Sequence, residues 1–256
     1  MVLELISGIL NAPLVTLIDF IKALLINPVQ ISLFYKLWSI IIYIFSFIYG
    51  LLLLWNGVML MTSGHDVEKR NKAKEWLKNI IIMIILIQAS YFLYETILTF
   101  NSLLTSGIFN FIDPSFLFIN LDNGILQGLL GILLMTPYIA ILLITCVVLV
   151  IRYVVVILGV VLLPIGIFCY FTPVLSDFGK FILYFLGLNI FSSFFASLAL
   201  LVCSYLLNID IFSNLSVFVA MAGFLVADFI IILFMAFSIF KAVAGSKHAL
   251  ISGLMK

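Results

Sequence analysis

The chain has 256 residues, of which 66% are hydrophobic and 9% are charged, and its formal net charge is +1. An average soluble domain is about 45–50% apolar and about 25% charged. The mean hydropathy of +1.38 therefore excludes a soluble enzyme, a disordered protein and a disulfide scaffold. The small net charge gives no whole-chain attraction to nucleic acid. The composition predicts an all-α, multi-pass protein of the cell membrane, with residues 1–256 forming a single membrane domain.

The first apolar stretch, residues 2–26, is interrupted by polar residues and proline, including Glu4, Pro13 and Asp19. An acidic residue near the start and the lack of an A-x-A cleavage site argue against a signal peptide. We predict that residues 1–30 hold an N-terminal helix that lies in the membrane interface. A weak transmembrane helix is the alternative for this stretch.

A transmembrane helix needs about 20 predominantly apolar residues. Four segments meet this condition without ambiguity, and they are 37–61, 79–104, 181–207 and 217–240. Tryptophan and tyrosine residues fall near their predicted ends, as is typical of membrane interfaces. These four segments are predicted to span the membrane.

The region 125–171 is too long for one span and too short for two spans with a turn. Thr136 and Pro137 make a favourable helix start, and Pro164 disfavours helix in the residue before it. We therefore predict helix breaks at Pro137 and Pro164 and a third span over 137–163. Residues 125–135 and 165–180 are then expected to be interfacial or re-entrant, covered by partner subunits.

The distribution of lysine and arginine predicts the orientation. The loop 63–78 contains Lys69, Arg70, Lys72, Lys74 and Lys78, and three more lysines lie after position 240. The loops 107–124 and 208–216 have no lysine or arginine. The positive-inside rule then gives five spans, with the N-terminus outside and the C-terminus inside.

The basic loop 63–78 faces the cytoplasm in this topology and carries a capping-box-like S-x-x-D pattern at Ser63 and Asp66. Its five cations can anchor the protein on anionic lipid. The alternative is docking of an acidic partner or of a DNA backbone.

Seven polar or charged residues inside the predicted spans form the predicted intramembrane polar layer. They are Gln88, Glu95, Arg152, Asn189, Ser193, Ser197 and Asp228. Ionisable groups are costly at membrane depth, so each is a candidate functional residue. Counting about 1.5 Å per residue from the inner helix ends places the three ionisable residues about 17–24 Å deep, in one layer near the midplane.

Arg152 with Asp228 is the expected ion pair, which either fixes helix register or lines a water-filled path. Alternatively, Arg152 snorkels to the inner interface. Asn189, Ser193 and Ser197 recur every four residues, so they form one face that serves helix packing or lines a conduit. Gln88 has the same two interpretations.

No catalytic motif is recognisable. The patterns HExxH, GxSxG, GxxxxGK[ST] and GxGxxG are absent from the sequence. The three cysteines lie in apolar runs without a CxxC, and His65 and His248 lie outside the apolar cores. We therefore predict no enzymatic activity, no catalytic residue, no metal and no cofactor.

Two stretches resemble a known family. They are GVMLMTSGHDVEKRNKAKEWLKN at 57–79 and IRYVVVILGVVLLPIGIFCYFTP at 151–173. The first stretch has an apolar helix, the pattern S-G-x-D-x-x-K-R and a second apolar helix. The second stretch has R-Y followed by two apolar runs that each end in proline. Both patterns are similar to those of the TrbL/VirB-type polytopic channel subunits of type IV secretion and conjugation machines. In size the chain is similar to the CedA membrane proteins of archaeal DNA exchange.

The resemblance implies a channel or platform subunit for DNA import or exchange. It also implies an oligomer in the lipid bilayer, with other small membrane subunits, a separate hexameric ATPase and DNA as the transported substrate. It carries over no catalytic residue. The alternative function is a secondary transporter or ion-coupled permease that uses Asp228 and Glu95, although such proteins often contain internal repeats and none is recognisable here.

Overall fold

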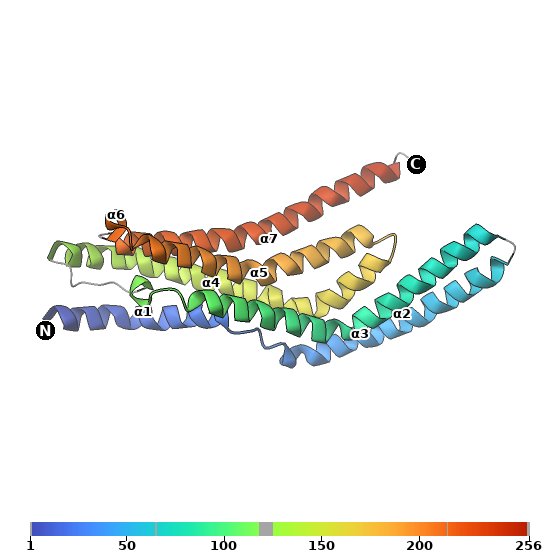
Figure 1. The fold of residues 1–256 in the computed structure, drawn as a ribbon, viewed down its shortest axis with the longest axis horizontal. Coiled ribbons are helices and arrows are strands. Elements are labelled where there is room, and N and C mark those ends of the chain that lie inside the picture. Colours follow the sequence, from blue (N-terminus) through green and yellow to red (C-terminus); the bar gives the residue numbers. More distant parts are fainter. Residues whose placement is uncertain (1, 65, 118–124, 214, 255–256) are drawn as a thin grey trace. The chain divides into compact units, whose positions relative to one another are not determined.

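A computed structural model describes residues 2–64, 66–117, 125–213 and 215–254, with side chains described within 13–64, 66–117, 133–212 and 215–237. These residues are helical apart from short connections. The six long helices are α1 (Val2–Ile26), α2 (Tyr35–Thr62), α3 (Val67–Phe109), α4 (Ile125–Phe171), α5 (Ser176–Leu206) and α7 (Ser216–Leu254). The short elements are α6 (Asp210–Ser213) and two 3-10 helices, Ile31–Phe34 and Pro114–Leu117. Figure 1 shows this order along the chain.

Five of these helices are long and apolar enough to cross a membrane. The candidate spans are Ile31–Thr62, Val67–Phe109, Leu133–Phe171, Ser176–Leu206 and Ser216–Phe237. The predicted all-α fold with five spans is therefore confirmed by helix length and hydropathy, and the chain is a multi-pass membrane protein. The residues 2–26 are helical as expected, while the interfacial position of this helix and the N-out orientation stay predictions.

The predicted helix breaks at Pro137 and Pro164 are wrong, because α4 is one helix of 47 residues that runs through both prolines. The stretches 125–135 and 165–171 are helical rather than irregular, and a turn at 172–175 leads into α5. A proline inside a helix removes one backbone hydrogen bond. Membrane helices tolerate this loss because neighbouring helices and local adjustments satisfy the freed carbonyl group.

The predicted loop 63–78 is also mostly helical, because α3 begins at Val67. With 43 residues, α3 is about 64 Å long, roughly twice the thickness of the hydrocarbon core. The charged residues therefore form the first turns of a helix whose apolar part starts after Asn79. Of the predicted outer loop 107–124, residues 118–124 lie outside the described part.

The chain packs as two compact units. The first unit comprises residues 1–29, 98–155 and 188–237, and the second comprises 30–97, 156–187 and 238–256. The helices α3, α4, α5 and α7 each contribute one segment to each unit. The single-domain prediction for the whole chain is not decided by this division.

The first unit has a continuous apolar core between segments of α1, α3, α4, α5 and α7. Leu142 and Leu149 of α4 contact the same buried cluster as Leu200 of α5 and Phe224 of α7. Side chains seven residues apart on α4 lie on one helix face, so the apolar spacing itself directs α4 toward its neighbours. This core holds the helix segments that carry most of the candidate polar residues.

The second unit contains the antiparallel hairpin of α2 and α3 (Figure 1). The indole nitrogen of Trp38 donates a hydrogen bond of 2.9 Å to Ser90 Oγ near one end of the pair. Near the other end, the buried amide of Asn56 donates to the Ala73 carbonyl at 3.1 Å and accepts from the Leu77 N–H at 2.9 Å. These two levels on α2 are about 27 Å apart, close to the thickness of the hydrocarbon core.

Candidate functional site

The polar side chains within the apolar helices gather in the first unit. Ten of them are buried there with at most 5% of their surface exposed, and they are Asn101, Thr105, Thr145, Arg152, Asn189, Ser192, Ser193, Ser197, Ser204 and Asp228. They come from the segments of α3, α4, α5 and α7 that pack in this unit. Five of the seven residues predicted from the sequence are in this set.

Arg152 is the centre of the larger group. Its Nε–H is shared between the Asn189 carbonyl at 3.1 Å and Ser192 Oγ at 2.8 Å. Its Nη2 donates to the Ile190 carbonyl at 3.0 Å and to Ser193 Oγ at 2.9 Å. A planar guanidinium presents its donors in a fixed fork, which here matches two carbonyls and two hydroxyls of one helix turn. Arg152 therefore fastens α4 to α5.

The two serines complete this arrangement through their own hydrogen bonds. Ser192 Oγ donates to the Asn189 carbonyl at 2.8 Å, and Ser193 Oγ donates to the Ile190 carbonyl at 3.4 Å. Ser193 Oγ also accepts a bond of 2.9 Å from Asn101 Nδ2 of α3. Three helices, α3, α4 and α5, thus meet in one hydrogen-bonded group.

Asp228 belongs to a separate contact between α7 and α4. Thr145 Oγ1 donates a hydrogen bond of 2.8 Å to Asp228 Oδ2, and Oδ1 of the same carboxylate has no hydrogen-bond partner among the described residues. The predicted ion pair between Arg152 and Asp228 is therefore wrong. The backbone carbonyls of α5 and the hydroxyls beside them supply the acceptors of Arg152 instead, an option that charge counting along the sequence does not reveal.

Ser197, on the predicted small polar face of α5, is fully buried, and its Oγ has no hydrogen-bond partner among the described residues. Asn189 and Ser193, on the same face, contact Arg152 through the Asn189 carbonyl and the Ser193 hydroxyl. The three side chains are all buried between helices. Helix packing is therefore the role that their positions support within this chain.

Gln88 and Glu95 differ from the other five residues, because both side chains are exposed on α3 in the second unit. The rings of Tyr35, Trp38 and Tyr91 contact one another near the start of α2. Such aromatic groups are typical of the membrane interface. Glu95 lies one helical turn beyond Tyr91, and its depth in the membrane stays a prediction.

Sequence reasoning missed Asn101, Thr105, Thr145, Ser192 and Ser204. Thr145 and Arg152 are seven residues apart on α4, and this two-turn spacing puts both on one helix face. That spacing could have marked Thr145. Ser192 is adjacent to the predicted Ser193, while Asn101 has no signal beyond its polarity within an apolar run.

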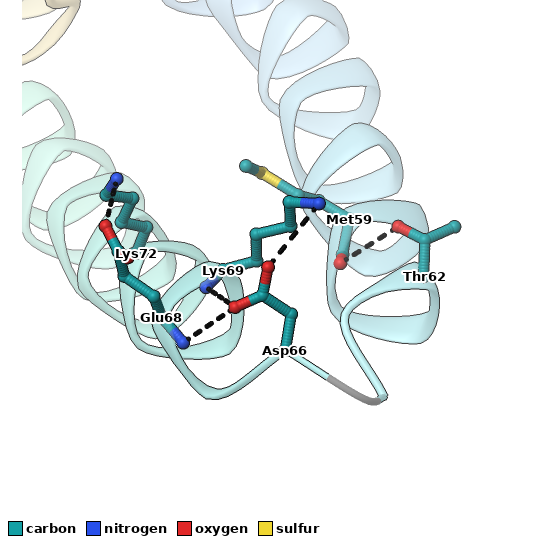
Figure 2. Close-up of polar contacts among 6 residues, drawn as sticks. All are labelled: Met59, Thr62, Asp66, Glu68, Lys69 and Lys72. Atoms are coloured by element: carbon teal, nitrogen blue, oxygen red, sulfur yellow. Dashed lines mark hydrogen bonds and ion pairs between the residues drawn. The ribbon is translucent and has the colours of Figure 1, made fainter.

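The tip of the α2–α3 hairpin forms the second candidate site. Asp66 Oδ1 accepts hydrogen bonds from the N–H groups of Glu68 at 3.0 Å and Lys69 at 3.2 Å (Figure 2). Asp66 is thus the N-cap of α3. The bond from the Lys69 N–H, followed by that from Glu68, holds the pKa of Asp66 below its ordinary value. Ser63 instead donates to the Leu60 carbonyl at the end of α2, so the predicted capping box is wrong.

The five predicted basic residues of the hairpin are all exposed, and they are Lys69, Arg70, Lys72, Lys74 and Lys78. Lys69 Nζ lies 3.5 Å from Asp66 Oδ2, and Lys72 Nζ lies 2.8 Å from Glu68 Oε1 (Figure 2). Both pairs are short-range helix contacts in water and contribute little stability. The surface is therefore available to an anionic partner.

Neither site has the composition of a metal centre. Among the residues that the structure describes, no three His, Cys, Asp or Glu side chains are grouped as metal ligands would be. Cys146 and Cys169 are buried, Cys203 is half-buried, and all three are free thiols. The chemistry that the first site supports is hydrogen bonding between helices, and the chemistry of the second is attraction of anions.

The chain was compared with known proteins by family, by sequence and by structure. No family model, no curated protein and no solved structure matches it.

Proposed function

We propose that the chain is a channel or platform subunit of a membrane machine that moves DNA, and that it depends on a partner ATPase for energy. Two features support the proposal. The stretches 57–79 and 151–173 resemble the TrbL/VirB-type subunits of type IV secretion, and the five apolar helices match the topology that such subunits are thought to have.

The observation that carries the platform role is the network around Arg152. In the first unit, Thr145, Asn189, Ser192, Ser193 and Asp228 are buried between helices, and the serines bonded to Arg152 hold α4 against α5. A water-filled path through one chain needs a polar lining in contact with water. A passage for a polyanion is therefore better built between several copies or subunits, for which this chain acts as a rigid membrane wall.

The outer surface of α2 suits such an assembly. Tyr43, Phe47 and Met61 expose 80%, 72% and 86% of their surfaces. In a membrane these side chains face lipid or neighbouring subunits. The basic hairpin tip then lies at the cytoplasmic side in the predicted topology, where it can meet a nucleotide-driven motor. The sequence itself has no phosphate-cradling GxxxxGK[ST] loop.

The proposal is tested by deleting the gene in the source cell and measuring the frequency of DNA transfer between genetically marked cells. We expect transfer to fall by at least about tenfold and to return when the gene is supplied again. Affinity purification of the tagged chain from membranes should recover small membrane subunits together with a hexameric ATPase. Transfer at the wild-type frequency in the deletion strain would contradict the proposed function.

A further inference from the structure

A shallow groove runs along the first half of α3, with a volume of about 360 Å³. It is lined by Lys74, Leu77, Lys78, Ile81 and Ile82. Positions 74, 78, 81 and 82 are spaced by four, seven and eight residues from the first, so they lie on one face of the helix. One end of the groove is therefore cationic and the other end is apolar.

Among the described residues, the two lysines of the groove form no ion pair. Asp66 pairs with Lys69 and Glu68 pairs with Lys72, while Glu75 lines a different pocket together with Lys72 and Trp76. Lys74 and Lys78 have no hydrogen-bond or ion-pair partner within the described part of the chain. No carboxylate is among the described residues that line the groove, so its polar end attracts an anion.

The apolar end leads toward the membrane. Ile81 exposes 48% of its surface, and Ile85, one turn further along α3, exposes 61%. Both belong to the candidate span Val67–Phe109. Trp76 is half-buried on the same helical turn as the lysines, as is typical of the membrane interface. The groove thus begins in water and continues into the hydrocarbon region.

We propose that this groove is a binding site for one anionic phospholipid. The phosphate group lies between the ammonium groups of Lys74 and Lys78, which are point charges suited to phosphate. One acyl chain lies along Leu77, Ile81 and Ile82. A nucleic acid or an acidic peptide satisfies the lysines but leaves the isoleucines uncovered, whereas a phospholipid matches both ends. The inference is independent of the proposed role in DNA movement.

The test uses the full chain purified in detergent and titrated with phosphatidylglycerol or phosphatidylcholine, with bound lipids counted by native mass spectrometry. We expect one phosphatidylglycerol to bind at least about tenfold more tightly than phosphatidylcholine, since each lysine near an anionic lipid contributes several-fold. The variant Lys74→Gln/Lys78→Gln should lose this preference, and Lys74→Arg/Lys78→Arg should keep it.

The matched control is Lys69→Gln/Arg70→Gln, which removes the same charge from the same hairpin but lies outside the groove. It should bind phosphatidylglycerol as the unmodified chain does. An equal loss in both double variants would overturn the proposal in favour of diffuse attraction. Displacement of the lipid by 10 mM inorganic phosphate would also overturn the proposal, because the lysines would then bind a free anion. If Lys74→Gln/Lys78→Gln lost binding to duplex DNA and kept its lipid binding, the lysines would be assigned to nucleic acid and the proposal would be overturned as well.

Discussion

Replacement of Arg152 tests whether its hydrogen bonds or its charge dominate the packing of α4 on α5. The four hydrogen bonds from Arg152 to α5 at about 0.6 kcal/mol each, the average for membrane proteins, contribute roughly 2–3 kcal/mol. Placing arginine at the centre of a membrane helix costs about 2.5–3.5 kcal/mol. These contributions nearly cancel, so Arg152→Leu should change the free energy of unfolding by no more than about 1 kcal/mol.

Arg152→Lys should be worse than Arg152→Leu. Lysine keeps the buried charge but loses the planar fork, so it cannot reach all four acceptors, and we expect a loss of about 2–3 kcal/mol. Leucine leaves no new unpaired donor on α5, because the Ser192 and Ser193 hydroxyls already donate to backbone carbonyls.

Both variants are measured by unfolding of the detergent-purified chain in a titration with dodecyl sulfate, followed by tryptophan fluorescence. Arg70→Lys and Arg70→Leu on the exposed hairpin serve as controls and should stay within about 0.5 kcal/mol of the original chain. A larger loss for Arg152→Leu than for Arg152→Lys would refute the reasoning. So would a coupling above about 0.5 kcal/mol between Arg152→Leu and Asp228→Leu, because the structure shows no shared contact.

Three further predictions follow from other contacts. In a double-mutant cycle, Thr145→Val and Asp228→Asn should couple by about 0.5–3 kcal/mol, because their hydroxyl and carboxylate share one buried bond; additive effects would exclude that bond. Gly179→Ala should strongly reduce the yield of folded protein, since an added Cβ would collide with the backbone of α4, whereas Gly187→Ala on the same helix meets nothing within 4 Å and should be tolerated. Because the pKa of Asp66 is lowered from 3.8, its cap should be complete above pH 3.8 and lost as the pH falls through the lower value. The protection factors of the hairpin-tip amides, which are corrected for the intrinsic pH dependence of exchange, should therefore fall only below pH 3.8, and a fall that begins near pH 6 would contradict the cap.

The number and order of the spans were predictable from the sequence because hydropathy over about 20 residues is a strong signal in a membrane protein. Helix boundaries were less predictable at prolines. Pro137 and Pro164 are breaking signals in water, where an unsatisfied carbonyl can turn to solvent. In the membrane no water is available to bond the backbone groups of an irregular segment, so the chain stays helical, and α4 continues through both residues.

The candidate residues on α4, α5 and α7 were predictable because polarity within an apolar run is costly. Their partners were not, since the acceptors of Arg152 include the backbone carbonyls of Asn189 and Ile190. Every residue has such a carbonyl, so composition cannot mark these two. The bond between Trp38 and Ser90 sets the level of α3 against α2, while the depth of Glu95, counted along the sequence from Asn79, stays a prediction.

The two polar sites differ in what they allow the chain to do. Arg152 is 3% exposed, and its donors are directed to groups of a neighbouring helix in the same unit, so it favours one fixed packing of α4 and α5. Lys74 and Lys78 are exposed and unpaired within the described residues, so their interaction energy is still available to another molecule. The proposed function, that of a subunit in a membrane machine that moves DNA, requires both properties. It requires a rigid interior that keeps its shape under the load of a transported polymer, and a cationic surface that holds the hairpin at the membrane interface, within reach of a motor protein.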